Sequence, residues 1–335
     1  MKSNLLFIAM CSLSLVSCND DDEMMPTPVA SEFSIVTASN TSGRISYTDL
    51  SQSSPTVEGL THFSFDADGI FYDPSNDGLI LASRTNNKLE FYNGIKSVIA
   101  TDVTSIVPAF SSTSDFNNPR EIAVMGDKVV VTQDQNAANG NTNKLVVYQK
   151  TSTGFTLLNS YTVNFKTWGI FLDGTTLYAV ADLTGDLVSF NNFFANASGA
   201  ITPTKRVTIE GLVRTHGIVH SAADNRMVLT DVGSATSDSD GGLIVINNFA
   251  SVYNSVANGG TLSLSNQVRV YGPNSTMGNP VDVAYDDVTE RIYVAERLNA
   301  GGRLLTFTLP TSNGDATPIE ARAEAGIASV FLVRR

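Results

Sequence analysis

Three acidic side chains, Asp182, Asp231 and Glu296, each end a short apolar run of the same kind. Carboxylates that recur in this way can form a ring around a cation, and Ca²⁺ takes six to eight oxygen ligands. Acidic side chains at such positions also accept hydrogen bonds from the backbone of the following turn. The pattern favours turn formation, with a metal site at these three residues as the alternative.

A second set of polar side chains stands just before, or at the start of, the most apolar runs. His216 is a candidate general base or ligand contact, because imidazole titrates near neutral pH. Trp168, the only tryptophan, could stack on a sugar or an aromatic ring. Two more ordinary interpretations stay open: a channel histidine bonded to a neighbour, and a tryptophan packed between structural units. The candidate ligand-binding residues are Arg120, Glu121, Trp168, Arg214, His216 and Asp282.

Motifs of several well-known catalytic classes are missing from the sequence. It contains no Gly-x-Ser-x-Gly, no Gly-Lys-Ser/Thr phosphate loop, no His-Glu-x-x-His and no paired-cysteine motif. An enzyme built on a nucleophile and a base is therefore not indicated. The formal charge of −12, from 21 Lys and Arg against 33 Asp and Glu, argues against a nucleic-acid partner. Of the 335 residues, 42% are hydrophobic and 16% charged, which excludes a disordered chain.

The candidate residues lie within a repeated pattern of short β-rich runs. The first run of each repeat contains Ile70, Ile122, Ile170, Ile218 or Val283, at spacings of 52, 48, 48 and 65 residues. Two further runs follow, after turn residues such as Asp173-Gly174. A fourth, more polar run fits an outer strand with one wet face. These fourth runs are Lys96 to Val103, Thr156 to Val163, Pro203 to Ile209 and Val268 to Tyr271. No helical pattern is evident.

Four strands in every ~40–50 residues is the period of a β-propeller. Residues 325–330 repeat the first run, whereas residues 33–38 and 43–47 repeat the second and third runs. We expect the two ends of the chain to share the last blade, which removes exposed sheet edges. The sequence predicts an all-β fold, a β-propeller of six four-stranded blades over residues 32–335. Seven blades are the alternative if an insertion near residues 251–265 hides strands.

The repeat unit resembles that of NHL-type and YncE-like propellers, and more distantly that of six-bladed gluconolactonases. Its pattern is Gly-Ile-x-x-Asp, then (Leu/Ile)-Tyr-Val-Ala-(Asp/Glu), then Leu-x-x-Phe, most clearly in residues 169–190 and 282–307. The resemblance implies a ligand near the central channel, bound by loops that lead into the inner strands or out of the second strands. It says little about function, because this scaffold carries many chemistries. The gluconolactonase likeness implies a divalent metal, for which Glu121, Asp182, Asp231, Asp282 and Asn279 could supply ligands.

Residues 1–17 are typical of a secretory signal, with Lys2 before the apolar run from Leu5 to Leu15. This run is too short to cross a bilayer core of ~30 Å as a helix. Leu15-Val16-Ser17-Cys18 matches a bacterial lipobox and predicts a lipid on Cys18. The acidic residues 20–23 resemble the surface-export signal of lipoproteins of the Bacteroidetes. We expect residues 18–31 to be a flexible tether and the protein to be held by its lipid on the outer membrane, at the cell surface.

Taken together, these patterns favour a non-catalytic binding module for a glycan, a peptide or an outer-membrane partner. The alternative is a divalent-metal-dependent lactonase or esterase of the gluconolactonase type, and a purely structural role is a third interpretation. Ca²⁺ is the only cofactor that the sequence suggests. The expected membrane contact is through the lipid on Cys18.

Overall fold

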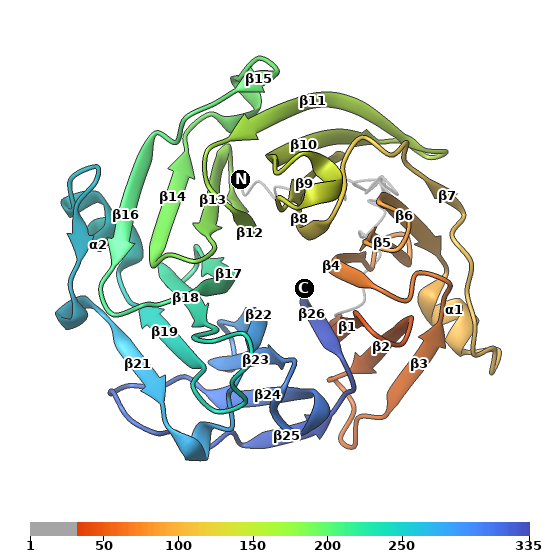
Figure 1. Ribbon diagram of the computed structural model, residues 1–335. Helices are drawn as coiled ribbons and strands as arrows, with labels where there is room; N and C mark the ends of the chain where they lie inside the picture. The colour runs from red at the N-terminus through yellow and green to blue at the C-terminus, as the bar shows by residue number, and fades with distance from the viewer. Residues whose placement is uncertain (1–31) are drawn as a thin grey trace, which may run out of the picture. The chain divides into compact units, whose positions relative to one another are not determined.

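Six antiparallel sheets are arranged in a ring in the computed structural model, which describes residues 32–335 (Figure 1). The predicted signal segment at residues 1–17 and the whole predicted tether at residues 18–31, with Cys18, lie outside the described residues. The innermost strands of the six sheets surround one axis, and the other strands of each sheet follow outward. The six-bladed β-propeller predicted from the repeat is therefore confirmed.

The blades share one strand order from the axis outward. The innermost strands are β4 (Ala67–Asp73), β8 (Pro119–Met125), β12 (Thr167–Asp173), β17 (Thr215–Ser221), β22 (Pro280–Asp286) and β26 (Ile327–Arg334). The second strands are β5 (Gly78–Ser83), β9 (Lys128–Gln133), β13 (Thr176–Ala181), β18 (Arg226–Asp231), β23 (Arg291–Glu296) and β1 (Phe33–Ser39). The third strands are β6 (Lys88–Asn93), β10 (Asn143–Lys150), β14 (Asp186–Phe190), β19 (Gly242–Ile246), β24 (Arg303–Thr308) and β2 (Arg44–Asp49).

The outer strands are shorter or more polar. The fourth strands are β7 (Phe110–Ser111), β11 (Phe155–Val163), β16 (Lys205–Ile209), β21 (Val268–Tyr271), β25 (Glu320–Ala323) and β3 (Val57–Thr61). Two blades carry a fifth, parallel strand, β15 (Gly199–Ala200) or β20 (Thr261–Leu262). The helical elements are α1 (Ile95–Ile99), α2 (Phe249–Ser255) and the 3₁₀ turns at Ala137–Asn139, Phe193–Ala195, Leu264–Asn266, Pro273–Ser275 and Asn299–Gly301.

Turn residues between the first and second strands have the backbone conformation that their types favour. Asp77, Gly126, Gly174 and Asn225 all adopt positive φ angles, between 52° and 61°, and Glu290 does so at 51° without being of a favoured type. Glycine adopts this region without a steric cost, and Asp and Asn tolerate it better than other residues. The turns predicted at residues 73–78, 173–174 and 223–225 are therefore confirmed.

The ring closes where the C-terminal strand β26 pairs with β1 in an antiparallel ladder. The register places Val36 opposite Phe331 and Phe33 opposite Arg334. One blade thus takes its innermost strand from the C-terminal end and its other three strands from residues 33–61. The predicted sharing of the last blade is confirmed. Because β26 pairs with β1, the inner edge of β1 is covered, and β26 takes the innermost place that the other blades give to their first strands.

The blade that contains β4 differs from expectation in its outer part. The run from Lys96 to Val103 is not an outer strand, because Ile95–Ile99 form α1 and the outer strand of that blade is β7. The backbone N–H groups of Lys96 and Ser97 bond to the carboxylate of Asp77, and Ile95 is fully buried. Alternation of apolar and polar residues in so short a run does not distinguish a strand from one turn of helix.

The insertion near residues 251–265 does not hide a blade. It contains most of α2, then β20 and a 3₁₀ turn, and β20 adds to the outer edge of an existing blade. Phe249 and Tyr253 anchor α2 in the core. The number of blades is therefore six rather than seven, and the expected absence of helix fails at α1 and α2.

The apolar core lies between neighbouring blades rather than on the axis. One cluster, for example, joins Val130, Leu145 and Val147 of one blade to Leu177 and Ala179 of the next. Because the faces of the sheets pack on each other, the six innermost strands are free to line a channel with other side chains. Within residues 32–335, no helix has the length and apolarity to cross a membrane.

Candidate functional site

The innermost strands share a register that fixes the levels of the channel. A bulge interrupts the pairing near the start of β4, β8, β12, β17 and β22. At each bulge, a residue whose type varies between blades is followed by a glycine or an acidic residue and then by Ile or Val. Bulges redirect side chains locally. The first residue of each three-residue stretch forms what we call the mouth level. These residues are Asp68, Arg120, Trp168, His216 and Val281.

Glycine at the second position lets neighbouring inner strands approach closely. A Cβ atom on Gly169 would lie 2.0 Å from the carbonyl oxygen of His216 on the next strand. A Cβ on Gly69, where φ is +79°, would lie 2.8 Å from the backbone nitrogen of Ile122. Two inner strands carry carboxylates at this level instead, Glu121 and Asp282. The glycine level therefore separates the mouth from the lower channel.

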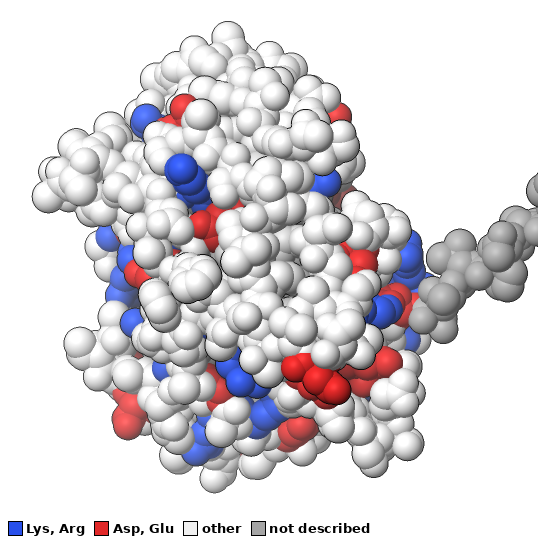
Figure 2. Space-filling model, turned by 90° about the vertical axis from the view of Figure 1, so that its right-hand side faces the viewer, with Lys and Arg blue, Asp and Glu red and all other residues white. Residues whose placement is uncertain are grey.

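A polar pocket of about 250 Å³ occupies the mouth. Its lining combines residues at the start of the inner strands with residues that follow the second strands, as the sequence predicts. Its lining holds four arginines and one carboxylate, and three of the arginines form ion pairs. The lining residues are Asn40, Asp68, Arg84, Arg120, Trp168, Arg214, His216, Ala235, Asn279, Val281 and Arg297. On the side of the molecule drawn in Figure 2, by contrast, basic and acidic side chains are interspersed among a majority of uncharged residues.

Trp168 is held between two cationic or polarisable side chains. The rings of Trp168 and His216 are stacked, with centroids 3.6 Å apart. The guanidinium carbon of Arg120 lies 4.0 Å from the centroid of the same indole. A parallel imidazole at this distance covers one face, so Arg120 lies on the other. The indole faces are thus both covered, and a ligand in the mouth meets the edges of this stack rather than an open aromatic platform.

Ion pairs link the side chains of the mouth across four blades. Asp68, Asp134 and Asp182 alternate with the basic groups, so each of these carboxylates contacts at least two of them. Such alternation fixes long side chains in place. The pairs are Asp66–Arg84 at 2.9 Å, Arg84–Asp68 at 3.5 Å, Asp68–Arg120 at 3.3 Å, Arg120–Asp134 at 3.2 Å, Asp134–Lys166 at 3.6 Å, Lys166–Asp182 at 3.4 Å and Asp182–Arg214 at 2.6 Å.

The pKa values at the mouth follow from burial and from these partners. Burial acts to raise the pKa of Asp182, but hydrogen bonds with His216 and Arg214 hold it well below its usual range. Burial lowers the pKa of His216 to about 4, against the opposing effect of Asp182. Burial raises the pKa of Asp68 to about 6, although Arg84 and Arg120 oppose the shift. At neutral pH His216 is therefore neutral and Asp182 is ionised.

Several buried polar atoms of the mouth have no hydrogen-bond partner among the described residues. They include Nε of Arg120, Nδ1 of His216 and Oδ1 of Asn279. The ring Nε2 of His216 lies 3.1 Å from Asp182, so Nδ1 is the atom left for another partner. Buried polar groups are nearly always paired in folded proteins. Unpaired donors and acceptors that share one pocket indicate a place where a polar ligand binds.

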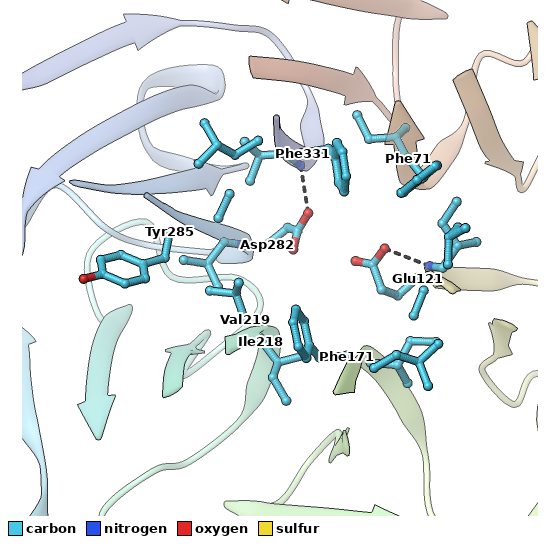
Figure 3. Close-up of a pocket in the computed structure, with 18 residues that line it drawn as sticks. Phe71, Glu121, Phe171, Ile218, Val219, Asp282, Tyr285 and Phe331 are labelled. Atoms are coloured by element: carbon cyan, nitrogen blue, oxygen red, sulfur yellow. Dashed lines mark hydrogen bonds between the residues drawn. The ribbon is translucent and has the colours of Figure 1, made fainter. Parts of the chain in front are cut away.

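Glu121 and Asp282, at the glycine level, line a second cavity that continues along the channel away from the mouth. The two carboxyl groups face each other from opposite sides of the channel (Figure 3). Glu121 Oε1 accepts from the backbone N–H of Ile122, and Asp282 accepts from Val283 and Val330. Burial raises the pKa of Asp282 to about 7, and burial with the nearby Asp282 raises the pKa of Glu121 well above its usual range.

The three carboxylates predicted as a metal set do not converge. Asp182 pairs with basic groups at the mouth, whereas Asp231 and Glu296 bond to backbone N–H groups of neighbouring turns. No cluster of three or more His, Cys, Asp or Glu suited to a metal occurs in the part of the chain that the structure describes. The donors to Asp231 are Val213, Arg214, Gly233 and the hydroxyl of Tyr271, and those to Glu296 are Gly278, Asn279, Leu298 and Asn299.

Of the predicted ligand-binding residues, Arg120, Trp168, Arg214 and His216 share the mouth pocket, and Glu121 and Asp282 share the lower cavity. Seven lining residues of the mouth are outside that predicted set: Asn40, Asp68, Arg84, Ala235, Asn279, Val281 and Arg297. Asp68 could have been found from the repeat, because Asp68-Gly69-Ile70 aligns with Trp168-Gly169-Ile170. Arg84 and Arg297 follow the second strands of their blades, at the position of Asp182.

The fold and the mouth pocket define a six-bladed β-propeller with a polar site at one end of its channel. No family model matches the chain, and no curated protein matches it in sequence. Solved structures match its fold. A chain of the nidogen/laminin complex has a TM-score of 0.60 at 11% identity, over 90% of this chain and 98% of that one.

Two of the similar structures come from Bacteroides and are described as candidate 6-phosphogluconolactonases. The Bacteroides fragilis protein has a TM-score of 0.60 at 12% identity, over 92% of this chain and 99% of its own. The Bacteroides uniformis protein has a TM-score of 0.56 at 10% identity, over 90% and 99%. At these identities the likeness shows the fold alone.

Proposed function

We propose that the protein is a non-catalytic binding module that holds an acidic sugar in the mouth pocket. The observation that carries the proposal is the gathering of four arginines and several unpaired buried polar atoms in one pocket of about 250 Å³. Arginine forks bind carboxylates through paired hydrogen bonds. Asn279 and Asp68 add acceptors for hydroxyl groups. A ring that carries one carboxylate and several hydroxyls matches this combination of donors and acceptors.

The proposal includes a location at the outer face of the outer membrane. A signal in residues 1–17, a lipid on Cys18 and an acidic tether support it. The repeat pattern also supports a relationship to NHL-type and YncE-like propellers of the Bacteroidetes. In the source organism, Cys18→Ser is expected to abolish incorporation of a labelled fatty acid and to release the protein from the membrane fraction. Unchanged labelling would refute the lipid anchor.

A lactonase is the second candidate, because two similar structures bear that name and a cationic mouth would also suit a phosphorylated sugar lactone. The five residues considered for its metal are dispersed. Asp182 and Asn279 belong to the mouth, Glu121 and Asp282 to the lower cavity, and Asp231 to a turn. Binding without catalysis is therefore the better-supported function. Hydrolysis of 6-phosphogluconolactone that is lost on chelation would reverse this order.

The binding proposal is tested by calorimetric titration of the full chain with D-galacturonate, D-glucuronate and neutral D-galactose. Arg297 is the informative residue, because it is exposed and forms no ion pair with the described residues. Loss of a charge-assisted hydrogen bond of ~1.5–3 kcal/mol predicts at least ~10-fold weaker uronate binding by Arg297→Gln.

Arg291→Gln is the matched control, because Arg291 is an exposed arginine at the start of β23, whereas Arg297 directly follows the end of that strand. It should bind uronate like the wild type, and binding by the wild type should weaken as salt is raised. Equal affinity for galactose and galacturonate, or no binding of either uronate, would refute the proposed acidic-sugar site.

A further inference from the structure

The lower cavity has a different chemistry from the mouth. Its volume is about 320 Å³, within the range of small-molecule sites. Except for Glu121, Asp282 and Tyr285, its lining is apolar, and no Lys, Arg or His contributes to it. The two carboxyl groups therefore have no positive partner within the cavity. Backbone N–H groups hold them in place, but these donors carry no charge.

Aromatic rings flank the line between the two acids. Phe71 and Phe331 lie on one side of it and Phe171 on the other (Figure 3). The rings of Phe71 and Phe331 are 5.0 Å apart at 60° to each other, so they form a continuous wall. All three rings are half-buried rather than enclosed, which shows that the cavity is accessible from solvent. The faces of such rings attract cations electrostatically.

We propose that the lower cavity binds an organic ammonium ion with an apolar body, such as an arylalkylamine. The ammonium group would lie between Glu121 and Asp282 and donate hydrogen bonds to their free lone pairs. The apolar body would replace water against Phe71, Phe171 and Phe331. A carboxylate or phosphate ligand finds no Lys, Arg or His partner in this lining, so this site is distinct from the acidic-sugar site at the mouth.

Proton release should accompany binding. Burial keeps protons on the acid pair near neutral pH, helped by the repulsion of Glu121 by Asp282 and of both acids by Asp68, and an ammonium ion between the acids favours their ionised form. Raising the pH removes these protons before the amine binds. The affinity for an amine should therefore rise with pH between about 5.5 and 7.5, by up to ~10-fold per pH unit for each proton displaced.

The test is calorimetric titration of the full chain with 2-phenylethylammonium chloride, and with 2-phenylethanol as a neutral probe of the same shape. Titrations in two buffers with different ionisation enthalpies measure the protons released. We expect the ammonium ion to bind, with proton release and with higher affinity at pH 7.5 than at pH 5.5. Glu121→Gln keeps the shape of the side chain and should weaken binding at least 10-fold. Arg291→Gln, at an exposed position that lines neither cavity, is the control and should leave amine binding unchanged.

Three results would overturn the proposal: no binding of the amine, equal binding of the alcohol, or amine affinity that is independent of both pH and Glu121→Gln. Because the wild-type pH profile and proton release are independent of any variant, a poorly folded Glu121→Gln protein would not hide the answer. Failure of uronate binding at the mouth would leave these measurements unaffected.

Discussion

The imidazole of His216 lies parallel to the indole of Trp168, with 6° between the ring planes and 3.6 Å between their centroids. Asp182 holds the far edge of the imidazole through Nε2, and Arg120 covers the other face of the indole. The sole tryptophan of the chain is thus a direct neighbour of the groups proposed to bind an anion. Its fluorescence should report on both protonation and occupancy of the mouth.

A first prediction concerns this fluorescence as the pH is lowered. Imidazolium quenches indole more strongly than neutral imidazole does, and burial lowers the pKa of His216 to about 4. Emission at neutral pH should therefore stay constant through pH 6.5 and fall only near pH 4. His216→Gln should remove that transition. A midpoint near 6.5 in the wild type would show that His216 is not buried as described.

A second prediction concerns Asp182→Asn. The side chain of Asp182 is fully buried and contacts Arg214, Lys166 and His216. Removing one partner of a buried ion pair leaves the other charges uncompensated, so the free energy of unfolding should fall by ~2–4 kcal/mol. Urea denaturation measures the loss. Asp102→Asn, at an exposed position after α1, should change it by less than ~0.5 kcal/mol. Equal stability of the two variants would contradict the network.

A third prediction concerns the close approach of the inner strands. In Gly169→Ala the new Cβ would clash with the carbonyl oxygen of His216 at 2.0 Å. Overpacking against backbone costs ~1–3 kcal/mol or more, and thermal denaturation should show a lower Tm. Gly154→Ala is the control, because nothing lies within 4 Å of its Cβ position. If both variants melted at the wild-type temperature, the strands would not be packed as closely as described.

A fourth prediction uses the raised pKa of Asp282, about 7 in the folded protein. A carboxyl whose pKa is raised on folding stabilises the fold while protonated, and this contribution is lost as the pH rises through its folded pKa. The amide side chain that Asp282→Asn introduces does not titrate in this pH range. The Tm of the variant minus that of the wild type should therefore increase between pH 4 and pH 7.5. Shifts from His62 and His216 are common to both proteins and cancel; parallel Tm curves would contradict the prediction.

The sequence by itself determined the repeat, the fold class and the place of the shared blade. These follow from local signals: β-rich runs, turn residues such as Asn225 and Gly174, and a period of about 50 residues. It also placed Arg120, Trp168, Arg214 and His216 among the candidates, because residues at equivalent repeat positions lie at the same level of a propeller. The prediction of an outer strand from Lys96 onward was wrong, since so short a run carries too little periodicity to exclude a helical turn.

Only the tertiary structure decided what these side chains do. The repeat cannot show that Trp168 is covered on both faces, because Arg120 and His216 come from the blades on either side of it. Nor can it show that Glu121 and Asp282, 161 positions apart in the sequence, face each other across one apolar cavity. Charge compensation, burial and pKa depend on distances between blades. Those distances are set when β26 pairs with β1 and closes the ring.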